Sequence, residues 1–410
     1  MTVTRERHAV EHAATGRSRA VDVTVVAHDV GSVGGMEHQI AELISGLLRL
    51  GHHVTVVARK FVPNEQDLGA SLPGVIEFHR VRGPARPALL AYPWFTVMAW
   101  FVVRRHRRGI VQATGAVVPN RVDVIAIHYC HQMSPASPSR SSALYRVHSW
   151  LVGHMLRLGE RACIRVNRSA TIVCVSEGVA DDVRAHYPRA AERVVTIQNG
   201  VDTDRFAPGV RAEDARALRA SLGISPSRPL AVFVGSDWER KGLELVLHAL
   251  ASAREWDLAI AGAGDRGRYE ALAASLGLER SVHWLGLTSD VQPVYEMAQA
   301  FVFPSSYEAF SLASLEAAAC GLPILATPIN GVRELIVDEE SGFVIDRDAG
   351  EIADRLKRLA ADPELMANIG SAAREAALAF GWDRMVARHH ELYAALANAK
   401  AAEGASRQTE

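Results

Sequence analysis

Short apolar runs recur along the chain, and each is followed by turn residues and then by a helical pattern. Val21–Ala27 is the clearest example, because it is rich in β-branched residues and precedes a glycine loop and a helical pattern over about residues 36–50. Val54–Ala58 is the next apolar run. Continuous apolar runs without alternation are typical of parallel strands that are covered on both faces. The sequence therefore predicts βαβ units and an α/β fold.

A chain of 410 residues exceeds the usual size of a single hydrophobic core, so we expect two domains. Residues 203–228 are polar and proline-containing, and we interpret them as the linker. We place one Rossmann-like domain at residues 20–203 and a second at 204–380, with a ligand-binding cleft between them. Residues 1–19 carry charge but no apolar core of a signal peptide, so we interpret them as a disordered leader, and residues 399–410 as a disordered tail.

Charge is distributed unevenly between the two halves of the chain. Residues 1–200 contain 24 Lys and Arg against 15 Asp and Glu, whereas the remainder contains 21 against 31. A basic first half could meet anionic lipid head groups or an acidic acceptor, and simple attraction between the two domains is the alternative. The four cysteines form no CxxC pair, which favours a reduced, cytoplasmic compartment.

Residues 86–108 form the most apolar segment. Its uninterrupted part is about 17 residues long, a length at the lower limit for crossing a bilayer. Pro93 interrupts its helical pattern. We therefore predict no transmembrane span. We expect a buried helix with a basic end. The alternative is a helix that lies on the inner face of a membrane, with Trp94, Trp100 and the Arg104–Arg108 cluster at the level of the head groups.

Two glutamates eight positions apart flank the start of a predicted helix in the second half of the chain. Ala300–Phe303 reads as a buried strand, Glu308 lies in the following loop, and Glu316 lies within a helical pattern over residues 311–319. The first N–H groups, at about residues 309–312, have no partner inside such a helix, so they and the helix dipole attract phosphate oxygens. Carboxylates can accept hydrogen bonds from sugar hydroxyls. This arrangement fits a nucleotide-sugar, and an ordinary strand–loop–helix unit with two solvated glutamates is the alternative.

Arg240 and Lys241 lie between a predicted strand, Leu230–Val234, and a predicted helix that starts at about residue 242. Two cations at that sheet edge could neutralise a diphosphate, and a solvated surface pair is the alternative. We therefore expect a site that needs no metal ion and no other cofactor.

The stretch 301–332, with its E-x7-E spacing and its GxPxxAT continuation, resembles the signature of the retaining glycosyltransferases of family 4, which have the two-domain GT-B fold. The resemblance extends from about Val21 to Leu396. Gly34, Gly35 and Glu37 are similar to the family's GGxE-like element, which lets the backbone approach the donor phosphates. His128, with His131 as second choice, matches the histidine that the family places near the donor sugar.

Further matches follow in the second half. The GSDWERKG loop is similar to that of bacterial lipopolysaccharide-core glucosyltransferases, although the family usually places its Arg directly after the glycine, where this chain has Ser236 after Gly235. Leu285 ends a strand whose counterpart in the family contacts the base. Residues 381–398 resemble the family's final helix, which crosses back onto the first domain. The family prefers glycine where this chain has Ala309 and Ser311.

The resemblance implies transfer of a hexose, with retention, from a nucleotide-sugar, most simply a UDP-sugar, to a glycan, glycolipid or other acceptor in cell-envelope polysaccharide synthesis. It implies that Arg240, Lys241 and residues Phe310, Ser311 and Leu312 hold the diphosphate. It also implies that Glu308 holds the sugar, that Glu316 holds the ribose, and that His128 orients the sugar and stabilises charge.

Two alternatives remain at this stage. A Rossmann-type dehydrogenase would need a G-x-G-x-x-G spacing, which the glycines after the first strand do not give. A non-catalytic nucleotide-sugar-binding protein would keep the phosphate site. We expect no nucleic-acid partner.

Overall fold

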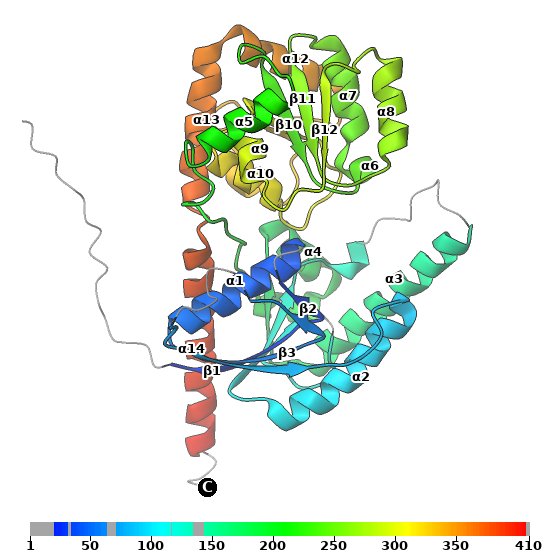
Figure 1. Cartoon of the computed structure of the whole chain (residues 1–410). Coiled ribbons are helices and arrows are strands. Elements are labelled where there is room, and N and C mark those ends of the chain that lie inside the picture. The colour runs from blue at the N-terminus through cyan, green and yellow to red at the C-terminus, as the bar shows by residue number, and fades with distance from the viewer. Residues whose placement is uncertain (1–19, 32–33, 64–70, 116, 134–142, 407–410) are drawn as a thin grey trace, which may run out of the picture.

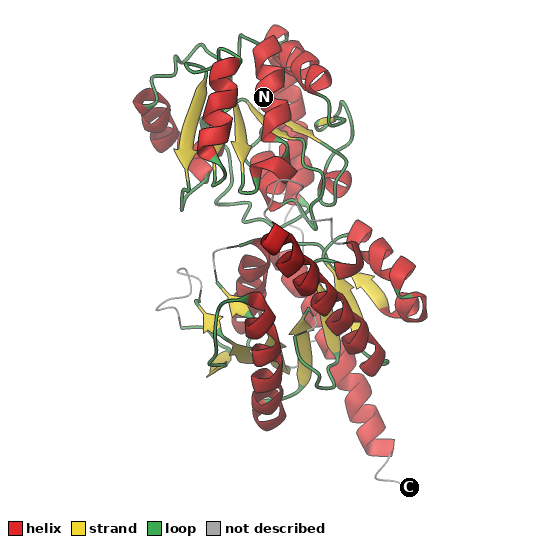
Figure 2. Cartoon of the chain, turned by 90° about the vertical axis from the view of Figure 1, so that its right-hand side faces the viewer, coloured by secondary structure: helices red, strands yellow, loops and turns green. Residues whose placement is uncertain are grey.

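The computed structural model describes residues 20–31, 34–63, 71–115, 117–133 and 143–406, so the predicted leader and the last four residues lie outside the described chain. Within these ranges the chain forms two α/β domains, each built around a parallel sheet (Figure 1). Helices cover both faces of each sheet (Figure 2). The expected fold class, two Rossmann-like domains, is confirmed.

The first domain contains a seven-stranded sheet in which all the pairs are parallel. In spatial order its strands are β5 (Val75–Arg80), β3 (His53–Ala58), β1 (Asp22–Val26), β6 (Ile110–Thr114), β7 (Val124–Ile127), β8 (Thr171–Cys174) and β9 (Val194–Thr196). A short parallel pair, β2 (Asp29–Val30) and β4 (Lys60–Phe61), lies beyond the ends of β1 and β3.

In the described part of the first half of the chain, several helices accompany this sheet. They are α1 (Gly35–Arg49), α2 (Ala88–His106), α3 (Ala143–Val166) and α4 (Glu177–His186), with 3-10 turns at His131–Met133 and Pro188–Arg193. Helix α1 forms because its apolar residues recur at helical spacing, and Ile40, Leu43, Ile44 and Leu47 are fully or almost fully buried. Helix α1 packs on one face of the sheet, and α2 and α3 contribute to the core on the other.

The second domain contains a six-stranded parallel sheet. In spatial order its strands are β12 (Val282–Gly286), β11 (Asp257–Ala261), β10 (Leu230–Val234), β13 (Ala300–Phe303), β14 (Ile324–Ala326) and β15 (Phe343–Val344). The helices are α5 (Ala212–Ser221), α6 (Trp238–Lys241), α7 (Leu243–Ser252), α8 (Arg266–Ser275), α9 (Gln292–Glu296), α10 (Leu312–Ala319), α11 (Val332–Leu335), α12 (Ala349–Ala361) and α13 (Pro363–Leu378). Strands β10, β11 and β13 are entirely buried, as their continuous apolar sequences require.

The last helix, α14 (Trp382–Ser406), returns to the first domain and packs against α1 (Figure 1). The chain crosses between the domains twice, near Val201 and near Phe380, and the two crossings lie side by side. Val201 N donates a hydrogen bond of 2.8 Å to Phe380 O. Two expectations about the connecting segments are wrong. The helix continues to Ser406, so residues 399–406 are helical and not a disordered tail. Helix α5, whose Ala215 is buried, occupies the middle of the predicted linker.

Helix α2 differs from the buried helix that the sequence suggested. Phe95, Ala99 and Val103 face the core, but Leu90, Trp94, Val97 and Phe101 are each more than half exposed. The helix is apolar on every side, so its sequence carried no sign of which side would face solvent. Among the described residues, no helix is both long and apolar enough to cross a membrane.

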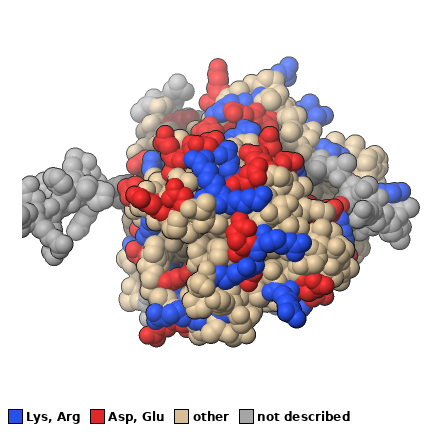
Figure 3. All heavy atoms as spheres, turned by 90° about the horizontal axis from the view of Figure 1, so that it is seen from above, with Lys and Arg blue, Asp and Glu red and all other residues tan. Residues whose placement is uncertain are grey.

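The surface of the second domain that faces away from the first carries charges of both signs. Acidic and basic side chains are intermixed there and form no single-sign patch (Figure 3). The negative charge of this half of the chain therefore does not gather on that face.

Candidate active site

The order of strands reverses between β1 and β6 in the first sheet and between β10 and β13 in the second, and the candidate residues lie at or next to these points. In the second sheet, β10 and β13 are neighbours, although the chain runs outward from them in opposite directions. Arg240 and Lys241 follow β10, and Glu308 follows β13. Because ligands of open α/β sheets bind beyond the carboxyl ends of strands at such reversals, the topology places these side chains at a binding position.

Glu308 is the centre of the charged cluster. Its Oε1 atom accepts hydrogen bonds from Arg240 Nη1 at 2.9 Å, Lys241 Nζ at 3.0 Å and Ser305 Oγ at 3.2 Å. All three contacts are to Oε1, and no described side chain donates to Oε2. Arg240 also binds Asp237 at 2.8 Å. The structure thus brings together the residues that the sequence predicted to face each other across the sheet edge.

Lys241 is held in a confined position. Its ammonium lies 4.4 Å from the centre of the Phe303 ring, and burial lowers its pKa, an effect that Glu308 partly opposes. Gly235, at the end of β10, makes room for this side chain. A Cβ atom at that position would lie 2.8 Å from Lys241 Cδ, and Gly235 has a φ of 143°. Gly235 therefore shapes the cation site through the space that it leaves.

The start of α10 is only partly open to a ligand. Ser311 caps the helix by accepting from Ser314 N, and Ser311 N itself donates to Asn330 O at 3.2 Å. Leu312 N lies 3.0 Å from Phe310 O. Neither oxygen belongs to α10, as expected, but the N–H groups of Ser311 and Leu312 are already engaged and are less available to a phosphate than the sequence suggested. The competing oxygens come from the Asn330 loop and from the tight turn at Phe310.

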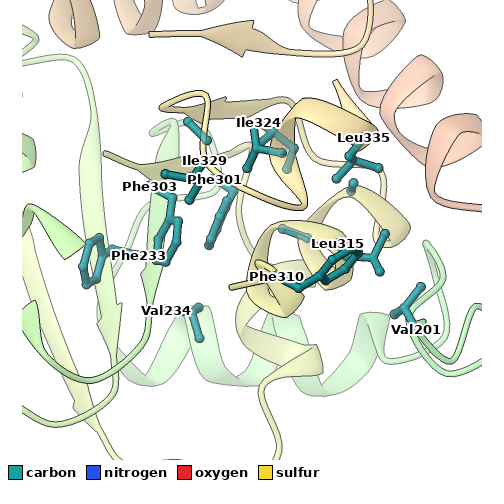
Figure 4. Packing of buried hydrophobic residues seen from close by; sticks show 14 of the residues in the cluster. Val201, Phe233, Val234, Phe301, Phe303, Phe310, Leu315, Ile324, Ile329 and Leu335 are labelled. Atoms are coloured by element: carbon teal, nitrogen blue, oxygen red, sulfur yellow. The ribbon is translucent and has the colours of Figure 1, made fainter. Parts of the chain in front are cut away.

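Two predicted donor contacts have side chains that are unsuited to the role. Phe310 is 8% exposed and packs in the apolar cluster next to Leu315 (Figure 4). Its ring centre lies 6.4 Å from that of Phe380. Leu285, at the end of β12, likewise packs against the core. Only the backbone of these residues could serve a ligand.

Glu316 lies on the inner face of α10. Its Oε2 atom accepts a hydrogen bond of 2.9 Å from the Tyr295 hydroxyl, and Tyr295 is fully buried. Burial raises the pKa of Glu316 to about 7, and the hydrogen bond from Tyr295 and the charge of Arg205 oppose this rise. Glu316 therefore changes its charge near neutral pH. Tyr295 is a partner that the sequence did not reveal.

In the first domain His128 follows β7, at the edge that faces the second domain. Its Nε2 atom lies 2.9 Å from Gln39 Oε1, while Gln39 Nε2 donates to Met385 Sδ at 3.6 Å. Nε2 is thus the protonated ring nitrogen. Burial, together with the smaller effect of the nearby His389, lowers the pKa of His128 to about 4. His128 is neutral at pH 7, so any stabilisation of charge by this residue would come from a neutral ring.

The glycine loop of the first domain meets the start of α10. Gly34 has a φ of 96°, which suits glycine, and it precedes α1. A Cβ atom at Gly35 would lie 3.3 Å from Leu312 Cδ1, so this loop lies directly against the α10 start of the other domain.

His131, the second choice for the histidine near the donor sugar, donates from its backbone N to Glu160 at 3.0 Å. Glu160 also accepts from the Tyr187 hydroxyl at 2.7 Å.

Several contacts join the two domains around these residues. The rings of Tyr129 and Tyr307 meet edge to face at 5.2 Å between centres. Glu334 Oε1 accepts from Glu177 N at 3.1 Å. These residues follow the carboxyl ends of strands or start the next helix, so the two sheet edges face one another.

A cavity of about 790 Å³ opens on the side of the first domain. Glu37, His128 and His131 contribute to its wall. The cavity continues between α2 and α3, where its lining is mostly apolar but includes Glu160. Its volume lies in the range of small-molecule sites.

No three His, Cys, Asp or Glu residues of the described chain gather in a way that could hold a metal ion. Two Asp-x-Asp pairs, a spacing that can bind a divalent cation, begin at Asp202 and Asp346. In the first pair Asp202 accepts from the backbone of Arg205 at 2.9 Å, and in the second pair Asp348 caps α12. The aspartates that carry these contacts thus serve local backbone geometry.

Two family models match the chain in succession. The model "Glycosyltransferase Family 4" matches residues 33–205, and "Glycosyl transferases group 1" matches residues 214–376. The D-inositol 3-phosphate glycosyltransferase of Streptomyces bingchenggensis is 27% identical over 396 residues, which cover 89% of this chain and 85% of that protein.

Solved structures with the same architecture include WaaG, a glycosyltransferase involved in lipopolysaccharide biosynthesis. It has a TM-score of 0.72 and 21% identity, and the match covers 90% of this chain and 99% of WaaG. The Anabaena protein HepE, solved in complex with UDP and glucose, has a TM-score of 0.68 and 18% identity, with 92% and 100% covered. At these identities the likeness shows the fold.

Proposed function

Because the chain is a glycosyltransferase of the GT-B type that uses a nucleotide-sugar, we propose that it transfers a hexose, with retention, from a UDP-sugar to an acceptor on the first domain. The observation that carries this proposal is Glu308, bound through one oxygen to both Arg240 and Lys241 at the reversal point of the second sheet. The complex of HepE with UDP and glucose supports the choice of UDP.

The departing diphosphate would rest on positive charge. Arg240 and Lys241 supply two cations, and the start of α10 adds the positive end of its dipole. We propose that these groups replace a metal ion and that the reaction uses no other cofactor. Lys241 is well suited to this role, because a buried cation interacts with a developing charge more strongly than an exposed one.

The two glutamates would bind the two sugars of the donor. Glu308 keeps Oε1 on the cations and can offer Oε2 to hydroxyls of the transferred hexose. Glu316, on the inner face of α10, would accept from the ribose hydroxyls. His128, neutral and hydrogen-bonded to Gln39, would orient the hexose. Gly34 and Gly35 would let the backbone of the first domain approach the phosphates.

Retention follows if the acceptor attacks from the side on which the diphosphate leaves. The bond between the anomeric carbon and the phosphate oxygen breaks, and a bond to the acceptor oxygen forms on the same face. The acceptor hydroxyl passes its proton to the leaving phosphate oxygen. The side chains would then position the reactants and stabilise charge without forming a covalent intermediate.

We further propose that the acceptor belongs to cell-envelope polysaccharide synthesis and that the enzyme works at the inner face of the membrane. The exposed stripe of Leu90, Trp94, Val97 and Phe101 on α2, with the Arg104–Arg108 cluster at its end, supports a peripheral contact with anionic lipid. The likeness of the loop at Arg240 to lipopolysaccharide-core enzymes points to the same setting.

The direct test is to measure UDP release from UDP-glucose, with and without candidate lipid and glycan acceptors, and to read the anomeric configuration of the product by NMR. Acceptor-dependent UDP release with an α-linked product supports the proposal. An inverted product would refute retention, and tight UDP binding without transfer to any acceptor would indicate a binding protein.

A further inference from the structure

The cavity between α2 and α3 is built differently from a pocket for a free sugar. Its walls are mostly apolar and come from Phe95 of α2, from Met155, Leu156 and Ile164 of α3, and from Ile125 of the sheet beneath, with Glu160 of α3 as an acidic exception. A buried sugar would leave its hydroxyls without partners along such a surface, at a considerable cost in free energy. Well-packed interiors contain few voids larger than a water molecule, so an opening of about 790 Å³ is not a packing fault.

One end of this cavity is polar. Asp29 and Arg59, which form an ion pair, line it together with His28 and Glu37. In the part of the chain that the structure describes, Asp29 Oδ1, Arg59 Nε and His28 Nε2 are buried and have no hydrogen-bond partner. Buried polar atoms normally have partners, so the polar groups at this end are incompletely satisfied. The side chains of Arg59 and Asp29 are 27% and 23% exposed, so their accessible atoms can bind a polar group in the cavity.

The outer surfaces of the same two helices are also apolar. The stripe on α2 has a counterpart on α3, where Val147, Trp150 and Leu158 recur at helical spacing and are each more than half exposed. The helices that form the walls of the cavity therefore also present a broad apolar surface to the outside, next to the Arg104–Arg108 cluster. Such surfaces commonly contact membranes.

We propose that the cavity holds the apolar tail of a lipid-linked acceptor. The tail lies between α2 and α3, and the head group lies at Asp29 and Arg59, from where its sugar reaches His128. The exposed faces of the two helices rest on the membrane from which the tail enters. This inference rests on the proposed function and names the class of its acceptor.

The test uses alkyl β-glucosides with octyl, decyl and dodecyl chains, below the concentration at which each forms micelles. Binding to the full chain is measured by isothermal titration calorimetry. Burial of two further methylene groups should tighten binding about tenfold in the wild type. Leu156→Trp fills the cavity and should reduce this dependence to less than twofold. Met155→Trp, at a second lining position of α3, should act in the same way if Leu156→Trp does not fold.

Leu158→Trp is the matched control, because Leu158 lies on the same helix but faces outward and does not line the cavity. It should keep the chain-length dependence of the wild type. Equal affinity for octyl and dodecyl glucoside in the wild type, or an unchanged dependence in the filled variants, would overturn the inference. UDP binding is measured on the wild type and on every variant, and it separates the two proposals. A wild-type protein that does not bind UDP would contradict the proposed function and not the lipid cavity.

Discussion

The two sheet edges that face each other across the candidate active site satisfy their polar groups in opposite ways. The edge of the second domain is ionic, because Glu308, Arg240, Lys241 and Asp237 neutralise one another. The edge of the first domain is neutral at His128, and an ion pair, Asp29 with Arg59, lies at the polar end of a cavity whose remaining wall is mostly apolar. We infer that the donor is held by charge and the acceptor by shape and apolar contact. Removal of charge should therefore cost much more at the second edge than at the first.

The largest effect is expected for Lys241→Ala. Loss of a buried cation at the departing diphosphate should lower turnover about a hundredfold, while the fold remains intact. Steady-state UDP release is the measurement, with circular dichroism as the check on folding. Lys357→Ala, which removes an exposed lysine of α12, should change the rate less than twofold. A near-normal rate for Lys241→Ala would remove this residue from the site.

Glu308→Gln distinguishes a role of Glu308 in binding the hexose from a role in binding the diphosphate. Turnover should fall at least tenfold, because the hexose loses its carboxylate. Affinity for UDP should stay constant or increase, because Arg240 and Lys241 are no longer neutralised by Glu308. Turnover and UDP binding are measured on the same preparation, with Glu270→Gln of the exposed pair on α8 as control. Weaker UDP binding would show that Glu308 serves the phosphates.

A membrane-binding experiment tests the role of the exposed apolar surface of the first domain. Trp94→Ser with Phe101→Ser should weaken binding to vesicles of phosphatidylglycerol and phosphatidylcholine about tenfold, through loss of buried apolar area. Sedimentation with the vesicles is the measurement. Val210→Ser with Leu287→Ser removes two exposed apolar residues from the second domain and should leave binding unchanged. Equal losses in both double variants would contradict a specific membrane face.

Glu316 predicts a dependence on pH. Its pKa of about 7 lies above the ordinary value, so burial stabilises the protonated form, and that stabilisation is lost as pH rises through 7. The ionised form is the one that accepts hydrogen bonds from ribose hydroxyls. UDP affinity of the wild type should therefore rise several-fold from pH 6 to pH 8, and Glu316→Gln should bind UDP with a flat profile. Calorimetric titrations at both pH values test this, and a steep profile in the variant would assign the dependence to another group.

The smallest effect is expected for His128→Gln. Glutamine can still donate to Gln39, so turnover should fall only about threefold. Since the pKa of His128 is about 4, the pH profile between 6 and 8 should keep its shape. A profile that loses one limb in the variant would show that His128 titrates in the working enzyme.

How far the sequence predicts this molecule depends on how local each feature is. The fold and the Glu308 cluster follow from short patterns, since strand ends and the following loops are read directly from the chain. Gln39 lies 89 residues from His128, and Tyr295 lies 21 residues before Glu316, so no local spacing indicates either pair. Ser311 N at the start of α10 donates to Asn330 O on another loop, and a contact between residues this far apart in sequence is likewise not indicated by local spacing. The orientation of α2 was unpredictable, because an all-apolar helix has no polar side.

The crossing of α14 has a consequence for how the protein is made. Met385, Val386 and Tyr393 of this helix belong to the core of the first domain, and the Tyr393 hydroxyl donates to Gln112 at 2.7 Å. The first half of the chain leaves the ribosome long before these residues exist. That half must therefore wait, with one face of its sheet incompletely covered, until the last helix has been made and supplies the missing layer.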